Sequence, residues 1–487
     1  MKNTYIGIDR GTSSVKLLLV DLDGQILAEE SESYEVIYPQ SGWTEQNPND
    51  WWQGTKKALE RLLKGQNKEY IRALSFGGQM HGLVALDENN NVIRNCLLWN
   101  DGRSEAEANC INDAIGKAKL TNLTGNIAFA GFTATKILWV KNHEPESFAR
   151  IRHILLPKDY LTYKFTGKLA TDLSDAGGTL LLDVKNRCWQ REMLDFIGVK
   201  EDWLPKLYES YKVVGEILPE IAREFGLNPD VKIIAGAGDN AAAAVGTGAV
   251  NNGDCNISLG TSGTIFLSSD SFVYDENCAL HGFCHSNGKW HFLGCILTAA
   301  SARKWWLEDI LGNGDYARDE LDIANADTEN LIFLPYLQGE RSPHNDVNAK
   351  GAFIGLTATT TKAQMSRAIM EGVAFAIRDC LEVIKANGVT PKIANLCGGG
   401  AKSHSWRQIM ADVLDLPINI LTTEQGPAFG AAILAMVGSG EYSTVEAATG
   451  KMVTVSETIL PISANAESYD KKYKKFKKAY PLLRELF

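Results

Sequence analysis

The sequence predicts a two-domain α/β protein, and three observations support this. The chain has 487 residues, more than one ordinary hydrophobic core accommodates. An apolar run at residues 231–235 breaks into Gly-Ala-Gly and then Asp239, Asn240 and four alanines, which indicates a buried strand, a tight turn and a helix start. A strand, a Gly-Thr-Ser turn and a second strand occur twice, around Gly11 and around Gly260, half a chain length apart. Such spaced self-similarity indicates a repeated unit.

Composition is that of a soluble globular protein, with 45% hydrophobic and 22% charged residues. A net charge of −10 argues against nucleic acid as the main partner, but a local Gly-rich turn with Mg²⁺ can still bind ATP. No apolar run reaches membrane-spanning length, and the start MKNTYIGID lacks a signal-peptide core, so we expect no membrane association. Nine scattered cysteines fit reduced thiols in a cytoplasmic protein.

The first half is expected to open with a β-hairpin at residues 4–29 that turns at Asp23 and Gly24. Asn47 and Pro48 are helix start signals and predict an amphipathic helix to about Leu63. Apolar runs predict two strands, each followed by a polar turn, at residues 71–76 and 96–99. Helical patterns follow at residues 132–142, 157–165 and 189–196.

The second half begins with the hairpin around Thr261 and includes a polar turn at residues 339–344. Strong helices are predicted at residues 361–386 and 405–414, with a strand at 393–396 between them, and the segment 426–430 leads the last core helix. The tail predicts an amphipathic helix whose aromatic residues pack and whose lysines are solvated. We place the domain boundary between residues 245 and 246 and expect the last helix to pack back on the first domain.

Asp239 is the strongest candidate for a catalytic or substrate-binding residue. It is expected at the carboxyl end of a strand, where open α/β folds bind ligands. The adjoining helix N-terminus favours an anion, so the carboxylate stays available to accept a proton. A purely structural N-cap is the alternative, but the neighbouring glycines allow close backbone approach and favour a functional role.

Two other kinds of site are weighed against this one. Residues 236–241 fit the dinucleotide pattern G-x-G-x-x-A, yet the acidic residue it requires is missing, since Asp254 precedes its strand. A zinc site would use Cys278, His281, Cys284, His285 and His291, whose spacing matches no closed structural pattern well. Neither a P-loop motif nor an H-R-D catalytic loop occurs.

Phosphate-binding and sugar-binding groups can also be proposed from the residues. Asp9 lies beside the first Gly-Thr-Ser turn and can hold Mg²⁺ directly or through water. The two hairpins, facing each other, would hold a polyphosphate from two sides, and Gly398–Gly400 would let backbone approach a flat or charged ligand. Polar groups at two strand ends suit a neutral polyhydroxyl ligand; they are Gln79, Met80, His81, Asn100, Asp101 and Arg103.

Taken together, these motifs resemble the FGGY carbohydrate kinases over nearly the whole chain. Residues 131–143 are similar to the first family signature, and residues 351–371 to the second. Within the family, four segments are most similar to the branch that phosphorylates D-xylulose: residues 78–82, 98–103, 156–160 and 236–240. Arg10 departs from the pattern, because the family usually has an uncharged residue there; this cation is expected to touch phosphate or to point to solvent.

The resemblance implies two actin-like (ribonuclease H-like) ATPase domains flanking an active-site cleft, with sugar mainly on residues 1–245 and ATP mainly on residues 246–487. It implies ATP- and Mg²⁺-dependent phosphorylation of D-xylulose at its 5-hydroxyl in pentose catabolism, with Asp239 as general base. The implied sugar contacts are Gln79, Met80, His81, Asn100, Arg103, Asp239 and Asn240. The implied nucleotide and phosphate contacts are Asp9, also the metal ligand, with Thr12, Ser13, Gly260, Thr261, Gly399, Gly400 and His404.

Other functions stay open at this point. The nearest alternative is a family kinase for another sugar or polyol, such as ribulose, fuculose or gluconate. A non-catalytic sugar sensor on the same fold is a second alternative, although a sensor needs no base such as Asp239. We expect small-molecule partners only, and a homodimer.

Overall fold

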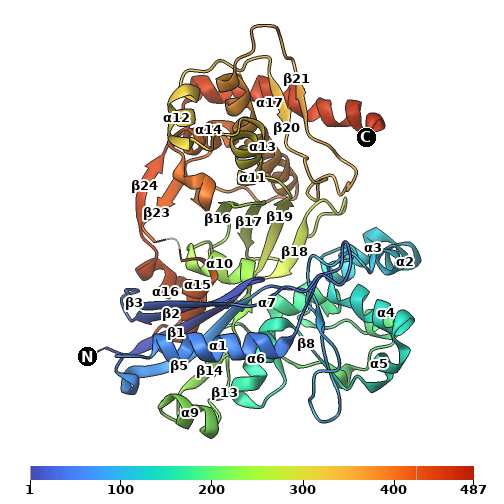
Figure 1. Cartoon of the computed structure of the whole chain (residues 1–487), viewed down its shortest axis with the longest axis vertical. Coiled ribbons are helices and arrows are strands. Elements are labelled where there is room, and N and C mark those ends of the chain that lie inside the picture. Colours follow the sequence, from blue (N-terminus) through green and yellow to red (C-terminus); the bar gives the residue numbers. More distant parts are fainter. Residues whose placement is uncertain (1, 424) are drawn as a thin grey trace.

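The computed structural model describes residues 2–423 and 425–487. Each half of the chain forms a mixed seven-stranded sheet covered by helices, and Figure 1 shows the first half below the second. The first sheet has the order β13-β14-β5-β1-β2-β3, with β15 also paired to β5. Its strands are β1 (Thr4–Arg10), β2 (Ser14–Asp21), β3 (Ile26–Ser33), β5 (Ile71–Gly78), β13 (Val213–Glu216), β14 (Lys232–Ile234) and β15 (Ala237–Gly238).

The second sheet has the order β18-β19-β17-β16-β22-β23-β24. Its strands are β16 (Cys255–Leu259), β17 (Gly263–Ser269), β18 (His281–Cys284), β19 (Trp290–Ile296), β22 (Ala394–Cys397), β23 (Ile418–Leu421) and β24 (Val455–Ile459). In both sheets three antiparallel strands, β1-β2-β3 in one and β16-β17-β19 in the other, are followed by two parallel strands beside the first of them: β1-β5-β14 and β16-β22-β23. This shared topology confirms the predicted repeat and differs from the parallel sheet of a dinucleotide-binding fold.

Helices cover both faces of the first sheet. One face packs on α1 (Pro48–Leu62), α6 (Pro157–Thr166) and α9 (Pro219–Phe225), whose apolar residues share one core with the sheet. A lobe beside it, drawn at the lower right of Figure 1, holds further helices. They are α2 (Glu105–Ile115), α3 (Lys117–Thr124), α4 (Thr133–His143), α5 (Pro145–Arg150) and α8 (Arg191–Ile197), whereas the short helix α7 (Leu173–Ala176) packs beside β15.

The opposite face of the first sheet is covered partly by the second half of the chain. The helices α15 (Gly426–Ser439) and α16 (Val445–Met452) share a core with β1 and α10 (Asp239–Gly246). A Cβ on Gly7 would lie 1.9 Å from the Ala428 carbonyl oxygen, and one on Gly430 would lie 1.8 Å from that of Ala242. Glycine is therefore required at both positions for α15 to approach so closely.

The last long helix, α17 (Ser463–Leu483), packs on α13 (Lys362–Ala386) and α14 (His404–Leu414) of the second half. The expectation that it packs on the first domain is therefore wrong, because its aromatic face meets Phe375 of α13. Its aromatic residues are buried as predicted, but Lys472 is buried too, where it pairs with Glu371.

The second half also contains α11 (Ala300–Lys304), a π-helical turn η4 (Trp305–Ile310) and α12 (Tyr316–Ile323). Short 3₁₀ helices are η1 (Lys68–Tyr70), η2 (Gly177–Thr179), η3 (Glu201–Trp203), η5 (Gly399–Lys402) and η6 (Arg484–Leu486). Short strand pairs complete the fold: β4 (Glu45–Gln46) with β7 (Cys96–Leu97), β6 (Val84–Leu86) with β8 (His153–Leu155), β9 (Ala170–Asp172) with β12 (Lys206–Tyr208), β10 (Leu182–Asp183) with β11 (Cys188–Trp189), and β20 (Ile332–Leu334) with β21 (Ala352–Ile354). No helix in the described ranges has the length and apolarity that crossing a bilayer requires.

Candidate active site

The first Gly-Thr-Ser turn joins β1 to β2, and its carbonyl oxygens are bonded from behind. Gly11 O accepts from the Tyr34 hydroxyl at 2.5 Å, and Ser13 O accepts from the Tyr34 backbone N–H at 3.1 Å. Thr12 O accepts from Gln46 Nε2 at 2.7 Å. Because the negative ends of these peptides are occupied, the remaining side of the turn suits an anion.

The second turn, between β16 and β17, is built in the same way. Gly260 O accepts from the Ala300 N–H at 2.8 Å, while Thr261 O accepts from the Ala299 N–H at 3.0 Å and from the Ser301 hydroxyl at 2.6 Å. The Thr261 side chain is exposed. The two copies of the repeat thus present equivalent turns, although different residues bond their carbonyls.

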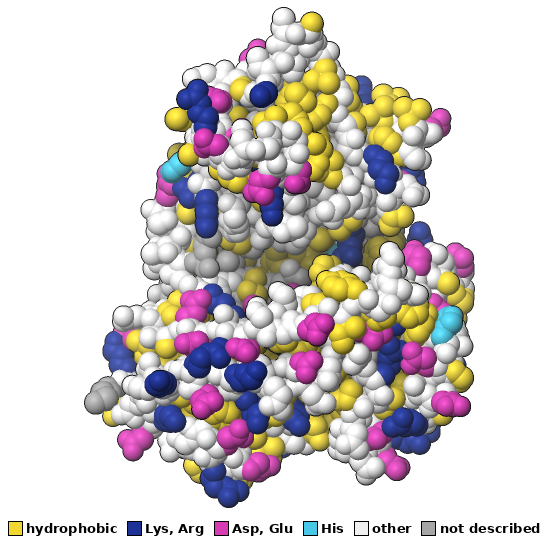
Figure 2. Space-filling model, in the orientation of Figure 1, with side chains coloured by type: hydrophobic (Ala, Val, Ile, Leu, Met, Phe, Trp, Pro, Cys, Tyr) yellow, Lys and Arg dark blue, Asp and Glu magenta, His cyan; other side chains and the backbone are white. Residues whose placement is uncertain are grey.

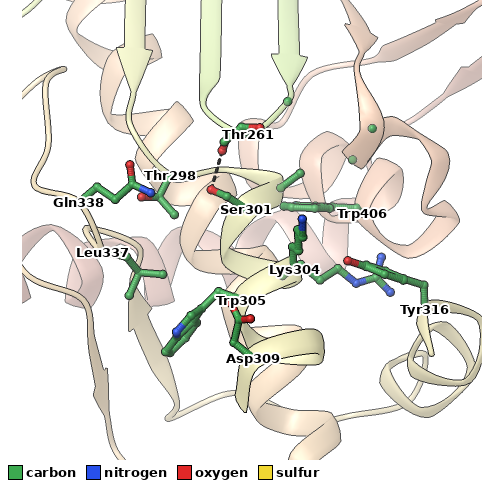
Figure 3. Close-up of a pocket in the computed structure, with 15 residues that line it drawn as sticks. Thr261, Thr298, Ser301, Lys304, Trp305, Asp309, Tyr316, Leu337, Gln338 and Trp406 are labelled. Carbon is green, nitrogen blue, oxygen red and sulfur yellow. Dashed lines mark hydrogen bonds between the residues drawn. The ribbon is translucent and has the colours of Figure 1, made fainter. Parts of the chain in front are cut away.

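A cavity of about 900 Å³ opens beside the second turn, a size suited to a nucleotide. Four predicted nucleotide contacts line it: Gly260, Thr261, Gly399 and Gly400. Figure 3 shows further lining residues that sequence reasoning missed, among them Thr298, Ser301, Lys304, Trp305, Asp309, Tyr316, Gln338 and Trp406. Most of them lie on α11, the π-helical turn η4 and the loops around them, and π-helical turns often mark functional sites. Predicted contact His404 is exposed at the first position of α14 and does not line this cavity.

Asp239 begins α10 directly after β15, as predicted, and is half-buried. Its Oδ1 accepts from the backbone N–H of Asn240 at 2.7 Å and from Asn240 Nδ2 at 3.0 Å. Burial, reinforced by the charge of Asp9, raises the pKa of Asp239 to about 7. A carboxyl group that titrates near neutral pH is well matched to general-base catalysis.

Asp9 lies near the end of β1, half-buried, and burial raises the pKa of its carboxyl group to about 6, partly offset by Lys16 and Arg10. Among the described residues, no hydrogen bond or ion pair within 4.0 Å engages its carboxylate. No group of three His, Cys, Asp or Glu side chains within residues 2–423 and 425–487 is arranged to hold a metal. A divalent cation at Asp9 would therefore take its other ligands from phosphate and water, as Mg²⁺ commonly does.

The proposed zinc ligands are used otherwise. His281 Nδ1 lies 2.8 Å from Asn126 Oδ1, and His285 Nε2 lies 2.9 Å from the Ala249 carbonyl. Cys278 bonds to the Thr121 hydroxyl.

His81, Met80 and the peptide that precedes Asp239 lie next to one another, and this row of residues is called the His81–Asp239 wall below. A Cβ on Gly238 would lie 2.9 Å from Met80 Cγ, and a Cβ on Gly178 would lie 2.6 Å from His81 Nδ1 and 3.0 Å from Met80 Cε. Met80 therefore packs against the peptide that precedes Asp239, and His81 lies at the far end of the wall. The two glycines leave room for these side chains.

The protonation state of His81 follows from its contacts. Burial lowers its pKa to about 3, so the ring is neutral near pH 7. Nδ1 lies 2.7 Å from the Gly178 carbonyl, which only accepts, so Nδ1 carries the proton and Nε2 is an acceptor. His81 also has φ 70°, and its carbonyl accepts from Lys136 Nζ at 2.8 Å, which fixes this left-handed conformation. An acceptor nitrogen held in this way suits a sugar hydroxyl.

A buried polar network supports the Asp239 turn from below. The Gly238 N–H donates to Ser174 Oγ at 3.1 Å, and Ser174 Oγ donates to Asp172 at 2.6 Å. Lys158 Nζ lies 3.0 Å from Asp172 and 2.7 Å from Asp159. The segment 156–160 thus acts beneath the site rather than in it.

Two predicted sugar contacts, Arg103 and Gln79, are buried in the first half of the chain. Arg103, whose side chain is 1% exposed, donates to Asp101 and Glu45 and stacks on Trp43. Gln79, 2% exposed, accepts from the Thr12 hydroxyl at 3.0 Å. Both side chains are buried and bonded to protein partners, so the structure does not favour Arg103 and Gln79 as sugar contacts, and that role stays a prediction.

The remaining candidates differ in exposure. Asn100 is exposed in the turn after β7, and Asn240 is half-buried beside Asp239, so both stay predicted contacts. Ser13 is exposed on the first turn. The Thr12 hydroxyl accepts from Trp99 Nε1 at 3.0 Å, so it anchors the turn to the neighbouring loop.

Arg10 neither touches a phosphate turn nor points to solvent, so both expectations for it are wrong. It is buried, stacks 3.5 Å over Trp51 and donates to Gln46 Oε1 at 2.8 Å. Since Gln46 in turn bonds to Thr12 O, Arg10 supports the first turn from below. The aromatic face provides part of the stabilisation that solvent normally gives a cation, while Nε and Nη1 of Arg10 have no hydrogen-bond partner among the described residues.

Two carbonyl-backed turns, a nucleotide-sized cavity and a carboxyl group titrating near pH 7 define a phosphotransferase site, and a hollow between the halves is visible in Figure 2. The chain belongs to the FGGY family of carbohydrate kinases: its N-terminal domain model matches residues 4–246 and its C-terminal domain model matches residues 255–439.

Individual relatives are similar over almost the whole chain. A xylulose kinase of Escherichia coli (strain K12) is 40% identical over 486 residues, 99% of each chain. The crystal structure of a xylulose kinase from Rhodospirillum rubrum superimposes with a TM-score of 0.93 at 27% identity and covers 99% of both chains. A gluconate kinase from Lactobacillus acidophilus gives a TM-score of 0.95 at 29% identity, over 99% of this chain and 98% of the other.

Proposed function

We propose that this carbohydrate kinase transfers the γ-phosphoryl group of ATP to the 5-hydroxyl of D-xylulose, as a step of pentose catabolism. The observation that carries the proposal is the wall from His81 through Met80 to Asp239, which offers an acceptor nitrogen at one end and a base at the other. The 40% identical xylulose kinase supports the choice of sugar. Asn240, which bonds to Asp239, is positioned to contact the same sugar.

Asp239 acts as the general base. It accepts the proton of the 5-hydroxyl while the sugar oxygen bonds to the γ-phosphorus, and the bond from phosphorus to the β,γ-bridging oxygen breaks to release ADP. The two turns orient the phosphates from opposite halves of the chain, which supplies positioning rather than covalent help. Closure of the hollow would exclude water, the competing acceptor.

Mg²⁺ belongs to this proposal, and the residues present fit it. Asp9 is the carboxylate beside the first turn, and the other ligands would be phosphate oxygens and water. Bound there, the cation supplies neutralisation of the phosphate charge. Lys16 is the residue opposite Asp9 in the antiparallel β1–β2 register, and it adds a positive charge to these two strands.

Gluconate is the second candidate acceptor, because the gluconate kinase structure superimposes as well as the xylulose kinase structure does. The two acceptors differ by a carboxylate, so activity distinguishes them directly. ADP release is measured with Mg²⁺-ATP and each of D-xylulose, D-ribulose, L-fuculose, gluconate, glycerol and no acceptor. A dominant response to D-xylulose is expected; a dominant response to another acceptor contradicts the substrate and keeps the reaction class.

Two further parts of the proposal concern the whole molecule. We propose a homodimer in the cytoplasm, and light scattering of the purified chain measures the mass in solution. ADP release that is abolished by EDTA and restored by Mg²⁺ is the expected metal dependence. No ADP release with any acceptor, with ATP still bound, would favour a sugar sensor instead.

A further inference from the structure

The turn at residues 339–344 carries an arginine that the reaction described so far does not use. The turn is fixed to the end of β19 by its backbone: the Ser342 N–H donates to the Cys295 carbonyl at 2.9 Å. Glu340 is buried, and its Oε1 accepts from the backbone N–H groups of Leu297 and Arg341, both at 2.8 Å. The backbone of Arg341 is therefore held in a defined position on the second half of the chain.

The side chain of Arg341 extends to the first half. Its Cζ lies 5.7 Å from the ring centroid of Phe129. Phe129 packs edge-on against Phe132, and Phe132 stacks on His81 with ring centroids 4.5 Å apart. The guanidinium group thus reaches the aromatic cluster behind His81, which lies at the end of the wall remote from Asp239.

The guanidinium group of Arg341 lacks acidic partners. Throughout residues 2–423 and 425–487, no carboxylate lies within 4.0 Å of its nitrogens and no side-chain hydrogen bond engages them. Two buried arginines of this molecule pair with carboxylates instead: Arg103 with Asp101 and Glu45, and Arg303 with Asp319 and Glu320. Five donors on a half-buried, ordered side chain require acceptors.

The position of this charge indicates which end of a substrate it meets. It helps to lower the pKa of His81 and of His281, whereas the causes that shift the pKa of Asp239 are burial, Asp9 and Asn240. The charges of both Arg341 and Asp239 affect the pKa of the Cys295 thiol, so both groups lie in the neighbourhood of Cys295. Arg341 is therefore placed opposite the phosphoryl-transfer end.

We infer that Arg341 binds the acceptor sugar at the end opposite to the phosphorylated hydroxyl, donating to the C2 ketone and C1 hydroxyl oxygens of a 2-ketose. This inference rests on the proposed function, since it takes a sugar along the His81–Asp239 wall as given. Arg341 is then a specificity-determining residue that the second half contributes to a sugar site built on the first. A planar group with two parallel N–H donors matches adjacent oxygens in a way that lysine does not.

The test compares Arg341→Met and Arg341→Lys with the wild-type chain, using D-xylulose and the polyol xylitol, which has a hydroxyl in place of the ketone. We expect Arg341→Met to raise KM for D-xylulose about tenfold or more, a loss of about 1.4 kcal/mol of binding. KM for ATP and the ATPase rate without acceptor should stay within about twofold. The ratio of kcat/KM for D-xylulose to that for xylitol should fall, with Arg341→Lys intermediate.

Several outcomes would overturn the inference. An unchanged ketose-to-polyol ratio in Arg341→Met refutes ketone recognition, even if KM rises, because a merely structural effect weakens both acceptors equally. A lower kcat with a raised KM for ATP assigns Arg341 to phosphate instead. The melting temperature shows whether Arg341→Met is folded. If it is not, the ratio of kcat/KM for D-xylulose to that for xylitol is compared between Arg341→Lys and the wild-type chain, and an unchanged ratio refutes the inference. The exposed Arg318→Met serves as control.

Failure of the proposed function is separable from failure of this inference. The acceptor profile of the wild-type chain alone decides the substrate. If gluconate is that substrate, the same variants are compared with gluconate and its polyol, sorbitol. Arg341 then has to discriminate a carboxylate from a hydroxyl. An unchanged ratio of kcat/KM for gluconate to that for sorbitol in Arg341→Met refutes this role of Arg341.

Discussion

Acidification tests the role of Asp239 most directly. Burial, and after it the charge of Asp9, raises the pKa of this carboxyl group to about 7. The proton-accepting form is the carboxylate, so the raised pKa predicts that activity falls as the pH drops through 7. For one titrating group, kcat/KM should be about half of its maximum at pH 7, about a tenth at pH 6 and about a hundredth at pH 5.

The assay is kcat/KM for the sugar from pH 5 to 9 at constant ionic strength, with ADP measured directly by chromatography. His81, with a pKa of about 3, stays neutral across this range and adds no limb, whereas Asp9, with a pKa of about 6, adds a second limb below pH 6. Asp239→Asn should lower kcat by about 10²–10⁴-fold, about 3–5 kcal/mol of transition-state stabilisation, and should remove the limb near pH 7, leaving only the limb below pH 6 that Asp9 causes. A constant kcat/KM from pH 5 to 8, or the same limb in Asp239→Asn, would refute the assignment.

Three further substitutions test other parts of the molecule. Gly178→Ala puts a Cβ 2.6 Å from His81 Nδ1, so KM for sugar should rise about tenfold while ATP binding, measured by calorimetry, is unchanged; an unaltered KM contradicts the wall. Thr261→Val removes a hydroxyl from the nucleotide cavity and should raise KM for ATP several-fold, but not KM for sugar. Lys472→Met removes one of the two cations that pair with the buried Glu371, while Arg367 remains, and should destabilise the fold by about 2 kcal/mol, seen as a lower melting temperature that the exposed Lys471→Met does not share.

The local sequence pattern was sufficient to predict the helices and strands that position the site. Thr361 was predicted to open a helix, and it caps α13 through its side chain. Asp239 was predicted at a strand end and helix start, and it begins α10. The hairpin repeat was readable because a Gly-Thr-Ser turn between apolar runs is a local signal. In each case neighbours in sequence determine the conformation.

Partners distant in sequence explain what the pattern missed. Arg10 was expected to touch phosphate or solvent and Arg103 to contact sugar. Each instead finds an aromatic face and an acceptor that only the folded chain assembles: Trp51 and Gln46 for Arg10, Trp43 and Glu45 for Arg103. The packing of α15, a helix of the second half, on the first sheet could not be predicted for the same reason.

The repeat also shows how a symmetric scaffold forms an asymmetric site. Asp9 and Ser258 hold equivalent positions, each two residues before the glycine of its turn, on β1 and β16. In the first copy this position carries a carboxylate near enough to Asp239 to raise its pKa. In the second copy it carries a hydroxyl beside the turn that lines the nucleotide cavity, where another carboxylate would repel the phosphates. Under the proposed function, both copies keep the turn because binding a polyphosphate from two sides needs both, whereas the proton and the metal need carboxylates on one side only.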